Sequence, residues 1–303
     1  MTIHHFIPTV FHNAIGSHAS ALTIASGDTV VTETVDAHGF DRHGKQPGQR
    51  PNPMTGPFHV EGAEPGDALR VRIDRISMTR GTGWTYQVLS PNVVNPDAVS
   101  RFPQPVKTEW LIDAATGLVR LAAPPPRLAD WSVPLRPMIG CFGVAPRLGQ
   151  AISTATSGPY GGNMDYRGFH AGVEVVFPVA VSGALFFVGD VHAAQGDGEI
   201  VGTGIETAAE VEFTVHVEKG RKIGWPRGEN RDDIFTVGNA RPLDQALQHA
   251  TTEMVDWLIQ DHGHDEVSAS HLLGQAVRYD IANVFNPAYS VVCRLAKSWL
   301  GRT

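Results

Sequence analysis

The segment Ala68–Met78, ALRVRIDRISM, shows most clearly what kind of fold this sequence encodes. In it Leu69, Val71 and Ile73 alternate with charged residues. Because successive side chains of an extended backbone point to opposite faces, the segment is predicted to be a half-buried β-strand. Glu210–Glu218, EVEFTVHVE, alternates in the same way and predicts a second strand.

Further extended segments and many turns surround these two strands. Ala21–Asp36 alternates like a strand, and Val173–Phe187 also has the character of extended chain. The 32 glycines and 21 prolines favour short strands joined by tight loops. We expect a loop at His38–Pro57 and an irregular connector at Leu118–Val144, which ends in the turn-rich GCFGVAP.

Only the C-terminal fifth of the chain has a helical period. Pro242–Asp261 is predicted to be an amphipathic helix that ends before Gly263, and a shorter helix is expected at about Glu266–Val277. The predicted apolar face of the first helix contains Leu243, Ala246, Leu247, Ala250, Met254 and Leu258. We therefore predict a mainly β unit over residues 1–303, with a β-rich core at 1–240 and a smaller α-containing segment at 241–303.

The composition excludes several classes of partner. The chain has 303 residues, 42% hydrophobic and 18% charged, and a formal net charge of -7. Its Lys and Arg residues are scattered, so nucleic acid and anionic membrane surfaces are not expected partners. A membrane span and a secretory signal are not expected either. The only cysteines, Cys141 and Cys293, form no CxxC pair, which favours a reducing cytoplasm.

The densest polar cluster is GDVHAAQGDGEIVGTGIE at Gly189–Glu206, directly after the apolar ALFFV. In an extended backbone, Asp190 and His192 would point to the same side and offer a carboxylate and an imidazole to a metal. A third ligand is expected from Asp36, which has the same spacing to His38, and Glu206 is a further candidate. The alternative for Asp-x-His is an ordinary hydrogen-bonded turn.

Two acids in this cluster are candidates for a general base. Beside a cation, Glu199 could take a proton from water whose pKa the metal has lowered, and Asp197 could serve instead. Gln195 lies close in sequence, and nearby glycines would let the backbone approach closely. The alternative for Glu199 is a solvated loop carboxylate.

A second polar group is GPYGGNMD at Gly158–Asp165. Asn163 could donate a hydrogen bond to a developing oxyanion, and Asp165 could bind a substrate nitrogen or the metal. An Asx turn is the structural alternative.

Nucleophilic chemistry offers one rival interpretation. Cys141 in GCFG could expose a thiolate, although a free cysteine is more often a small buried hydrophobic residue. GxSxG, GxGxxG and GxxxxGK[ST] motifs are missing from the sequence. A non-catalytic domain that binds metal or small molecules is a further alternative.

Four blocks of this sequence resemble the acetamidase/formamidase family: NPMTGPFHVEGAEPGD (Asn52–Asp67), GCFGVAP, GPYGGNMD and GDVHAAQGDGEIVGTGIE. The resemblance implies hydrolysis of the C–N bond of small amides to ammonia and a carboxylate. It also implies a β-sandwich or jelly-roll-like core, a divalent metal that is zinc or calcium, and a homo-oligomer. By match to the family's motifs, Asp36, Asp190 and His192 are expected at the metal, with Glu199, Asn163 and Asp165 nearby.

Two positions depart from the family pattern. Tyr160 stands where several relatives carry histidine, and His38 is not a family-wide choice. Together with Asp165 and Gln195 they are the residues we expect to bind substrate. An enlarged pocket for a different amide, a lactam or a carbamate would fit these departures.

Overall fold

The computed structural model describes residues 1–301, and its first sheet joins distant parts of the chain. Apart from the parallel pair β1 and β4, its neighbouring strands run antiparallel. Within the described residues this sheet has nine strands, in the order β1 (Ile3–Phe6), β4 (Thr29–Glu33), β18 (Ala209–Glu218), β6 (Ala68–Met78), β15 (Glu174–Pro178), β19 (Arg227–Glu229), β20 (Asp233–Ala240), β22 (Tyr289–Ala296) and β21 (Arg278–Asn283).

The second sheet supplies the strands that carry most of the polar motifs. Its main path runs β10 (Val133–Pro134), β9 (Leu118–Leu121), β8 (Lys107–Asp113), β7 (Thr82–Tyr86), β17 (Glu206–Thr207), β16 (Phe186–His192), β11 (Met138–Val144), β14 (Gly161–Asn163) and β13 (Ser157–Gly158). From β16 the sheet branches to β5 (Thr55–Val60), which pairs in parallel with β3 (Leu22–Ile24). A small separate sheet pairs β2 (Ala14–Ile15) with β12 (Ile152–Ser153).

The two large sheets pack face to face around an aromatic core. The ring of Phe213 on β18 lies 5.3 Å from that of Phe58 on β5 and 5.0 Å from that of Phe186 on β16. All three side chains are almost completely buried, which stabilises the fold by roughly 1.5–3 kcal/mol for each ring removed from water. The expected β-sandwich core is therefore confirmed.

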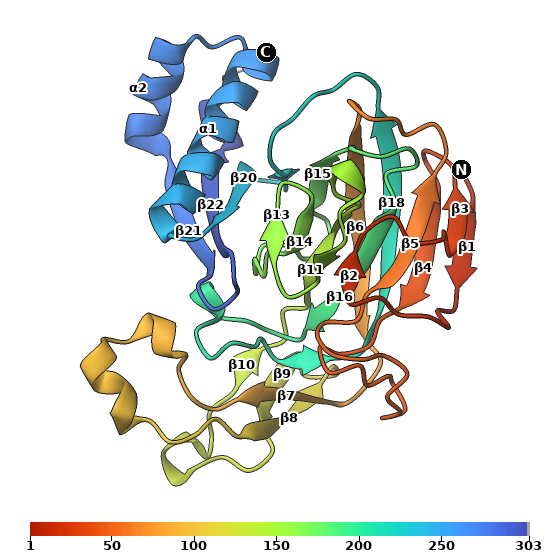
Figure 1. Ribbon diagram of the computed structural model, residues 1–303. Helices are drawn as coiled ribbons and strands as arrows, with labels where there is room; N and C mark the ends of the chain where they lie inside the picture. Colours follow the sequence, from red (N-terminus) through yellow and green to blue (C-terminus); the bar gives the residue numbers. More distant parts are fainter. Residues whose placement is uncertain (302–303) are drawn as a thin grey trace.

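The helices lie at one end of the sandwich, beside β20 and β22 (Figure 1). Helix α1 (Leu243–His262) ends at Gly263, whose φ of 69° closes the last turn, and α2 spans Glu266–Ala276. Met254 and Leu258 of α1 are buried in one cluster with residues of β20 and β22. Both predicted helices are confirmed, but Leu247 is exposed, because the neighbouring turns of α1 supply the sheet-facing side chains.

Strands β7 to β10 extend the second sheet below the sandwich in Figure 1. A small core of Trp110, Ile112, Val119, Ala193 and Ile205 joins this extension to the segments that follow β16 and precede β17. The chain after β16 therefore lies between the sandwich and the extension. Neither helix in the described part of the chain is long and apolar enough to cross a bilayer.

Two sequence predictions need correction. The stretch Leu118–Val144 is not an irregular connector throughout, because GCFGV belongs to the buried strand β11, which lies between β16 and β14 in the second sheet. Glycine inside a strand often marks a place where a neighbouring group approaches the backbone closely. In β11 this occurs at Gly140. The alternating stretch Ala21–Asp36 forms two strands, β3 and β4, because the chain turns at Gly27, which has a φ of 94°.

Candidate metal centre

A buried group of acids surrounds one histidine where the second sheet meets its loops. Asp190 and His192 end β16, and Glu206 begins β17 directly opposite His192 in the strand register. Glu199 ends the short 3-10 helix η5 (Asp197–Glu199), and Asp165 follows β14. Each of these residues is at most 6% exposed, so none is an ordinary surface charge.

The ligand-type atoms of this group converge. His192 Nε2 lies 3.0 Å from Glu206 Oε1 and 3.5 Å from Asp190 Oδ1. Asp165, Asp190 and His192 offer atoms that all lie within 4.8 Å of one another, and so do His192, Glu199 and Glu206. Two sets of donors that share His192 are spaced closely enough to surround a cation.

Four buried atoms in this group have no hydrogen-bond partner among the described residues: Asp165 Oδ1, Asp190 Oδ1, His192 Nε2 and Glu206 Oε2. An unsatisfied buried polar group costs about 1–3 kcal/mol, and a charged one costs more. The group therefore fits a bound cation, which would satisfy these oxygens and the nitrogen together.

Gln195 determines which nitrogen of His192 carries the proton. The Nε2 group of Gln195 donates to the backbone carbonyls of Asp165 (2.5 Å) and Ala282 (3.4 Å), which can only accept. Gln195 Oε1 is therefore the atom that lies 2.9 Å from His192 Nδ1, and Nδ1 must donate to it. In a neutral ring this leaves the Nε2 lone pair directed at the acids, as in a metal-binding histidine.

The electrostatics of the group favour an added positive charge. Burial raises the pKa of Asp165 to about 7, with a further contribution from Asp190, and raises that of Glu206 to about 8. Burial and Asp165 raise the pKa of Glu199 well above its ordinary value. Burial acts to lower the pKa of His192, but Glu206 and Asp190 outweigh it and raise that pKa well above its ordinary value. A proton or a metal ion would relieve this concentration of acids.

The backbone of the group is strained. Asp165, Asp190 and Glu199 have φ values of 45°, 56° and 48°, and Asn52, which donates to Asp190, has a φ of 31°. Residues other than glycine rarely adopt these backbone conformations. Each costs on the order of 1–3 kcal/mol, and such conformations occur preferentially at functional sites. The surrounding contacts hold the acids at angles that an unstrained strand would not provide.

Asparagines that sequence reasoning missed hold the acids in place. Asn52 Nδ2 donates to Asp190 Oδ2 (3.1 Å) and to Asn163 Oδ1 (3.0 Å). Asn283 Nδ2 donates to Asp165 Oδ2 and to Glu199 Oε2, and Asn286 Nδ2 donates to Asp165 Oδ2 at 2.7 Å. Asn52 opens one of the four family-like blocks, which was a usable signal. Asn283 ends β21 and Asn286 follows it, in a segment that offered no such signal.

Two glycines make room for the acids and the imidazole. A methyl group on Gly140 of β11 would collide with Asp165 Oδ1 and lie 2.9 Å from Asp190 Oδ2. A methyl group on Gly204 would overlap the ring of His192. Gly140 of GCFGVAP and Gly204 of GTGIE therefore allow the side chains of this group to approach the backbone closely.

Asp36 does not join this group. Its Oδ1 accepts from the backbone amides of His38 and Phe40, and its Oδ2 accepts from Arg80 (2.8 Å) and Trp84 (3.0 Å). All four contacts satisfy the carboxylate, which lines a separate cavity of ≈ 390 Å³. The structure therefore does not bring Asp36 together with Asp190 and His192 as expected, whereas it places Asp165 beside those two residues.

The other sequence candidates divide between the group and its surroundings. Asn163 is buried and accepts a hydrogen bond from Asn52, which links it to the group. Gln195 contacts His192 directly. Asp197 is half exposed and pairs with Arg167 at 2.5 Å on the surface. Tyr160 is buried in the hydrophobic core, and the ring of His38 packs 4.0 Å from the ring of Trp84.

Cys141 lies within β11 and is completely buried. Burial, together with Asp190 and Asp165, raises the pKa of its thiol well above the ordinary value. Its Sγ contacts the carbonyl oxygen of Thr154 at 3.7 Å. A thiol in this environment stays protonated and is a poor nucleophile.

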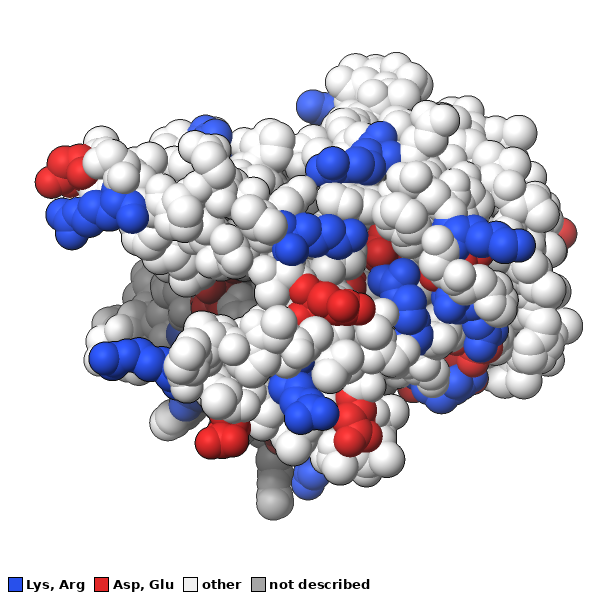
Figure 2. Space-filling model, turned by 90° about the horizontal axis from the view of Figure 1, so that it is seen from below, with Lys and Arg blue, Asp and Glu red and all other residues white. Residues whose placement is uncertain are grey.

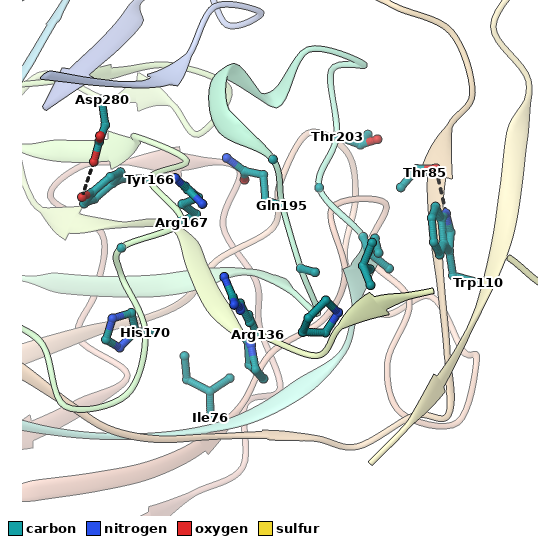
Figure 3. A pocket seen from close by; sticks show the side chains of 18 of the residues that line it. Ile76, Thr85, Trp110, Arg136, Tyr166, Arg167, His170, Gln195, Thr203 and Asp280 are labelled. Carbon is teal, nitrogen blue, oxygen red and sulfur yellow. Dashed lines mark hydrogen bonds between the residues drawn. The ribbon is translucent and has the colours of Figure 1, made fainter. Parts of the chain in front are cut away.

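A large cavity borders the buried group. It has a volume of ≈ 920 Å³, and Gln195 and Gly204, which both contact His192, form part of its wall. Figure 3 shows Gln195 between the side chains of Tyr166 and Thr203 in this wall.

On the underside of the molecule, Figure 2 shows Lys and Arg side chains interspersed with Asp and Glu.

The fold and the site thus define a β-sandwich protein with a buried centre of acids and one histidine, and comparison with known proteins gives its family. The sequence model of the Acetamidase/Formamidase family matches residues 11–154 and 148–250. The chain therefore belongs to the acetamidase/formamidase family, which confirms the resemblance seen in its motifs.

Individual relatives agree with this assignment. The chain is 28% identical to the acetamidase of Mycolicibacterium smegmatis over 240 residues, which cover 63% of this chain and 59% of that protein. It therefore spans about three-fifths of the length of this curated relative. The crystal structure of a predicted acetamidase/formamidase from Thermoanaerobacter tengcongensis matches with a TM-score of 0.86 at 28% identity, covering 99% of this chain and 97% of that one. The structure of an acetamidase from Yersinia enterocolitica matches with a TM-score of 0.86 at 31% identity and covers 99% and 93%.

Proposed function

We propose that this protein is a metal-dependent hydrolase that cleaves the C–N bond of small amides, of the formamide or acetamide type, to ammonia and a carboxylate. The names of its relatives support amide hydrolysis. The observation that carries the metal-dependent part is that Asp165, Asp190, His192 and Glu206 each have an unpaired buried atom and belong to two closely spaced donor sets that share His192.

Asp165, Asp190, His192 and Glu206 would hold the metal ion, and we propose zinc rather than calcium. Calcium takes oxygen ligands, whereas zinc accepts a mixture of imidazole nitrogen and carboxylate oxygen. The tautomer that Gln195 imposes on His192 supports a nitrogen ligand. A divalent cation bound there would act as a Lewis acid toward the amide carbonyl and lower the pKa of a water molecule.

The protein's own residues would handle the proton and the oxyanion. We assign Glu199 as the general base, because it is buried within 4.8 Å of both His192 and Glu206, whereas Asp197 is half exposed. Glu199 would take a proton from the attacking water and deliver it to the leaving nitrogen as the C–N bond breaks. Asn163 Oδ1 is engaged by Asn52, which leaves the Nδ2 group of Asn163 as a donor for the oxyanion.

Metal removal tests this proposal directly. We expect exhaustive chelation to reduce ammonia release from formamide and acetamide to the background rate, and readdition of zinc to restore it. Metal analysis of the same samples should show that zinc and activity are lost and regained together. Full activity in a metal-free sample would reject the metal-dependent mechanism, and ligand binding without ammonia release would indicate a non-catalytic binding protein.

Replacing Cys141 with alanine separates this mechanism from a thiol amidase. We expect kcat/KM for acetamide to stay within about two-fold, because the metal mechanism does not use the thiol. The free energy of unfolding should fall by about 1 kcal/mol through the loss of buried packing. Steady-state ammonia release and urea unfolding measure both quantities, and loss of nearly all activity in a folded variant would favour the thiol mechanism.

The homo-oligomeric state and the cytoplasmic location stay predictions from the sequence. Sedimentation of the purified protein would test the first, and fractionation of cells would test the second.

A further inference from the structure

The cavity beside the metal centre is far larger than formamide or acetamide requires. Its volume of ≈ 920 Å³ lies within the range of about 300–1,000 Å³ that is typical of pockets for drug-sized ligands. Two residues of its wall, Gln195 and Gly204, contact His192, so the cavity lies directly behind the imidazole of the buried group. A substrate that reaches the metal centre from this side would leave most of the cavity unfilled unless it carried a sizeable group.

One part of the wall suits an apolar or aromatic group. Trp110 and Trp131 meet edge to face with ring centroids 5.7 Å apart, and Ile76 and Val133 also line the space. The indole N–H of Trp110 donates to Thr85 Oγ1 at 2.9 Å, which fixes that ring. Such walls bind flat apolar groups through buried area and ring contacts.

The charged part of the wall is basic, although the chain as a whole has a net charge of -7. Three arginines line the cavity together with a single acid, Asp280. Arg167 pairs with Asp197 at 2.5 Å, and Arg294 pairs with Asp280 at 3.2 Å. Within residues 1–301, Arg136 makes no ion pair and no side-chain hydrogen bond, and Figure 3 shows it extending into the cavity.

The acids behind Gln195 determine where an anionic group of the ligand would lie. They repel a second carboxylate, whereas the unpaired guanidinium of Arg136 attracts one. A ligand that spans the cavity would therefore place its amide at the Gln195 wall and a carboxylate at Arg136, with an apolar portion between them.

We propose that the preferred substrate is a primary amide whose acyl group carries an aromatic or similarly bulky apolar portion ending in a carboxylate. This inference rests on the proposed amidase function and names its substrate class. Water adds to the amide carbonyl, the C–N bond breaks, and the products are ammonia and a dicarboxylate. Arg136 would act as a specificity-determining residue that contacts the distal carboxylate.

Three amides test the proposal on the zinc-loaded protein: acetamide, phenylacetamide and the para-carboxylate derivative of phenylacetamide. We expect kcat/KM to be highest for the carboxylated amide. Arg136→Gln should lower kcat/KM for that substrate by about 10- to 100-fold, the size of a hydrogen bond to a charged group, mainly through KM. Its effect on kcat/KM for phenylacetamide and acetamide, which carry no carboxylate, should be at least several-fold smaller.

Arg127→Gln is the matched control, because Arg127 is exposed and does not line the cavity. A wild-type preference for acetamide, or equal effects of Arg136→Gln on the neutral and carboxylated amides, would overturn the proposal while leaving amidase function intact. Calorimetric binding of the carboxylated amide gives a readout independent of turnover. Binding that depends on Arg136 without hydrolysis of any amide would reject the amidase function but support the assignment of the cavity.

Discussion

Replacing His192 with alanine is expected to lower kcat/KM for acetamide by roughly 10³-fold, near the upper end of what loss of a single charge-stabilising group causes. His192 is the only residue shared by both candidate sets of metal ligands, and its Nε2 atom lies 3.0 Å from Glu206 and 3.5 Å from Asp190. Its loss would leave the acids without their nitrogen partner. Zinc content measured on the purified variant should fall together with the rate.

Two further variants separate this effect from a general loss of folding. Asp190→Asn keeps the volume of the side chain and an oxygen that can accept from Asn52, so it should fold while it loses zinc and activity. His249→Ala removes a histidine that stacks 4.4 Å from Trp225, away from the acids, and should retain both. If folded His192→Ala and Asp190→Asn proteins kept zinc and normal rates, the metal centre would have to lie elsewhere.

Glu199→Gln should lower kcat by about 10²- to 10⁴-fold, the contribution typical of a general base. Glutamine keeps the shape of Glu199 and an oxygen that can accept the hydrogen bond from Asn283, so the fold and the zinc content should change little. Because the change removes proton transfer rather than binding, KM should stay near the wild-type value. Steady-state kinetics with parallel metal analysis measures all three quantities.

Asp197→Asn is the control for this experiment, because Asp197 lies two residues from Glu199 but pairs with Arg167 on the surface. We expect its kcat to stay within about two-fold, since exposed ion pairs contribute little. A large loss in Asp197→Asn with a silent Glu199→Gln would exchange the roles of the two acids.

The elements with strong local periodicity could be predicted from the sequence. Ala68–Met78 and Glu210–Glu218 correspond to β6 and β18, and Pro242–Asp261 corresponds to α1. These patterns involve only residues that are close in sequence. A strand with one buried face has an apolar residue at every second position, and a helix with one buried face has one at every third or fourth position. GCFGVAP was misjudged because glycine there serves contact with Asp165 and Asp190 rather than a turn.

Within the site, the spacing of Asp190 and His192 was sufficient to predict that their side chains lie in one group, since both residues belong to β16. The partners from other segments could not be predicted in the same way. Asp36 has the same local spacing as Asp190, yet Arg80 and Trp84 hold its carboxylate elsewhere. Asp165 takes the expected place because β14 pairs with β11 beside β16.

The sequence by itself therefore determined the class of fold, the family and one edge of the proposed metal centre, because each depends on residues close together along the chain. Only the tertiary structure decided the full group of acids around His192, the supporting asparagines at 283 and 286, and the cavity with its unpaired Arg136. These features depend on strand register and on contacts between segments separated by more than a hundred residues, for which a single sequence carries no local signal.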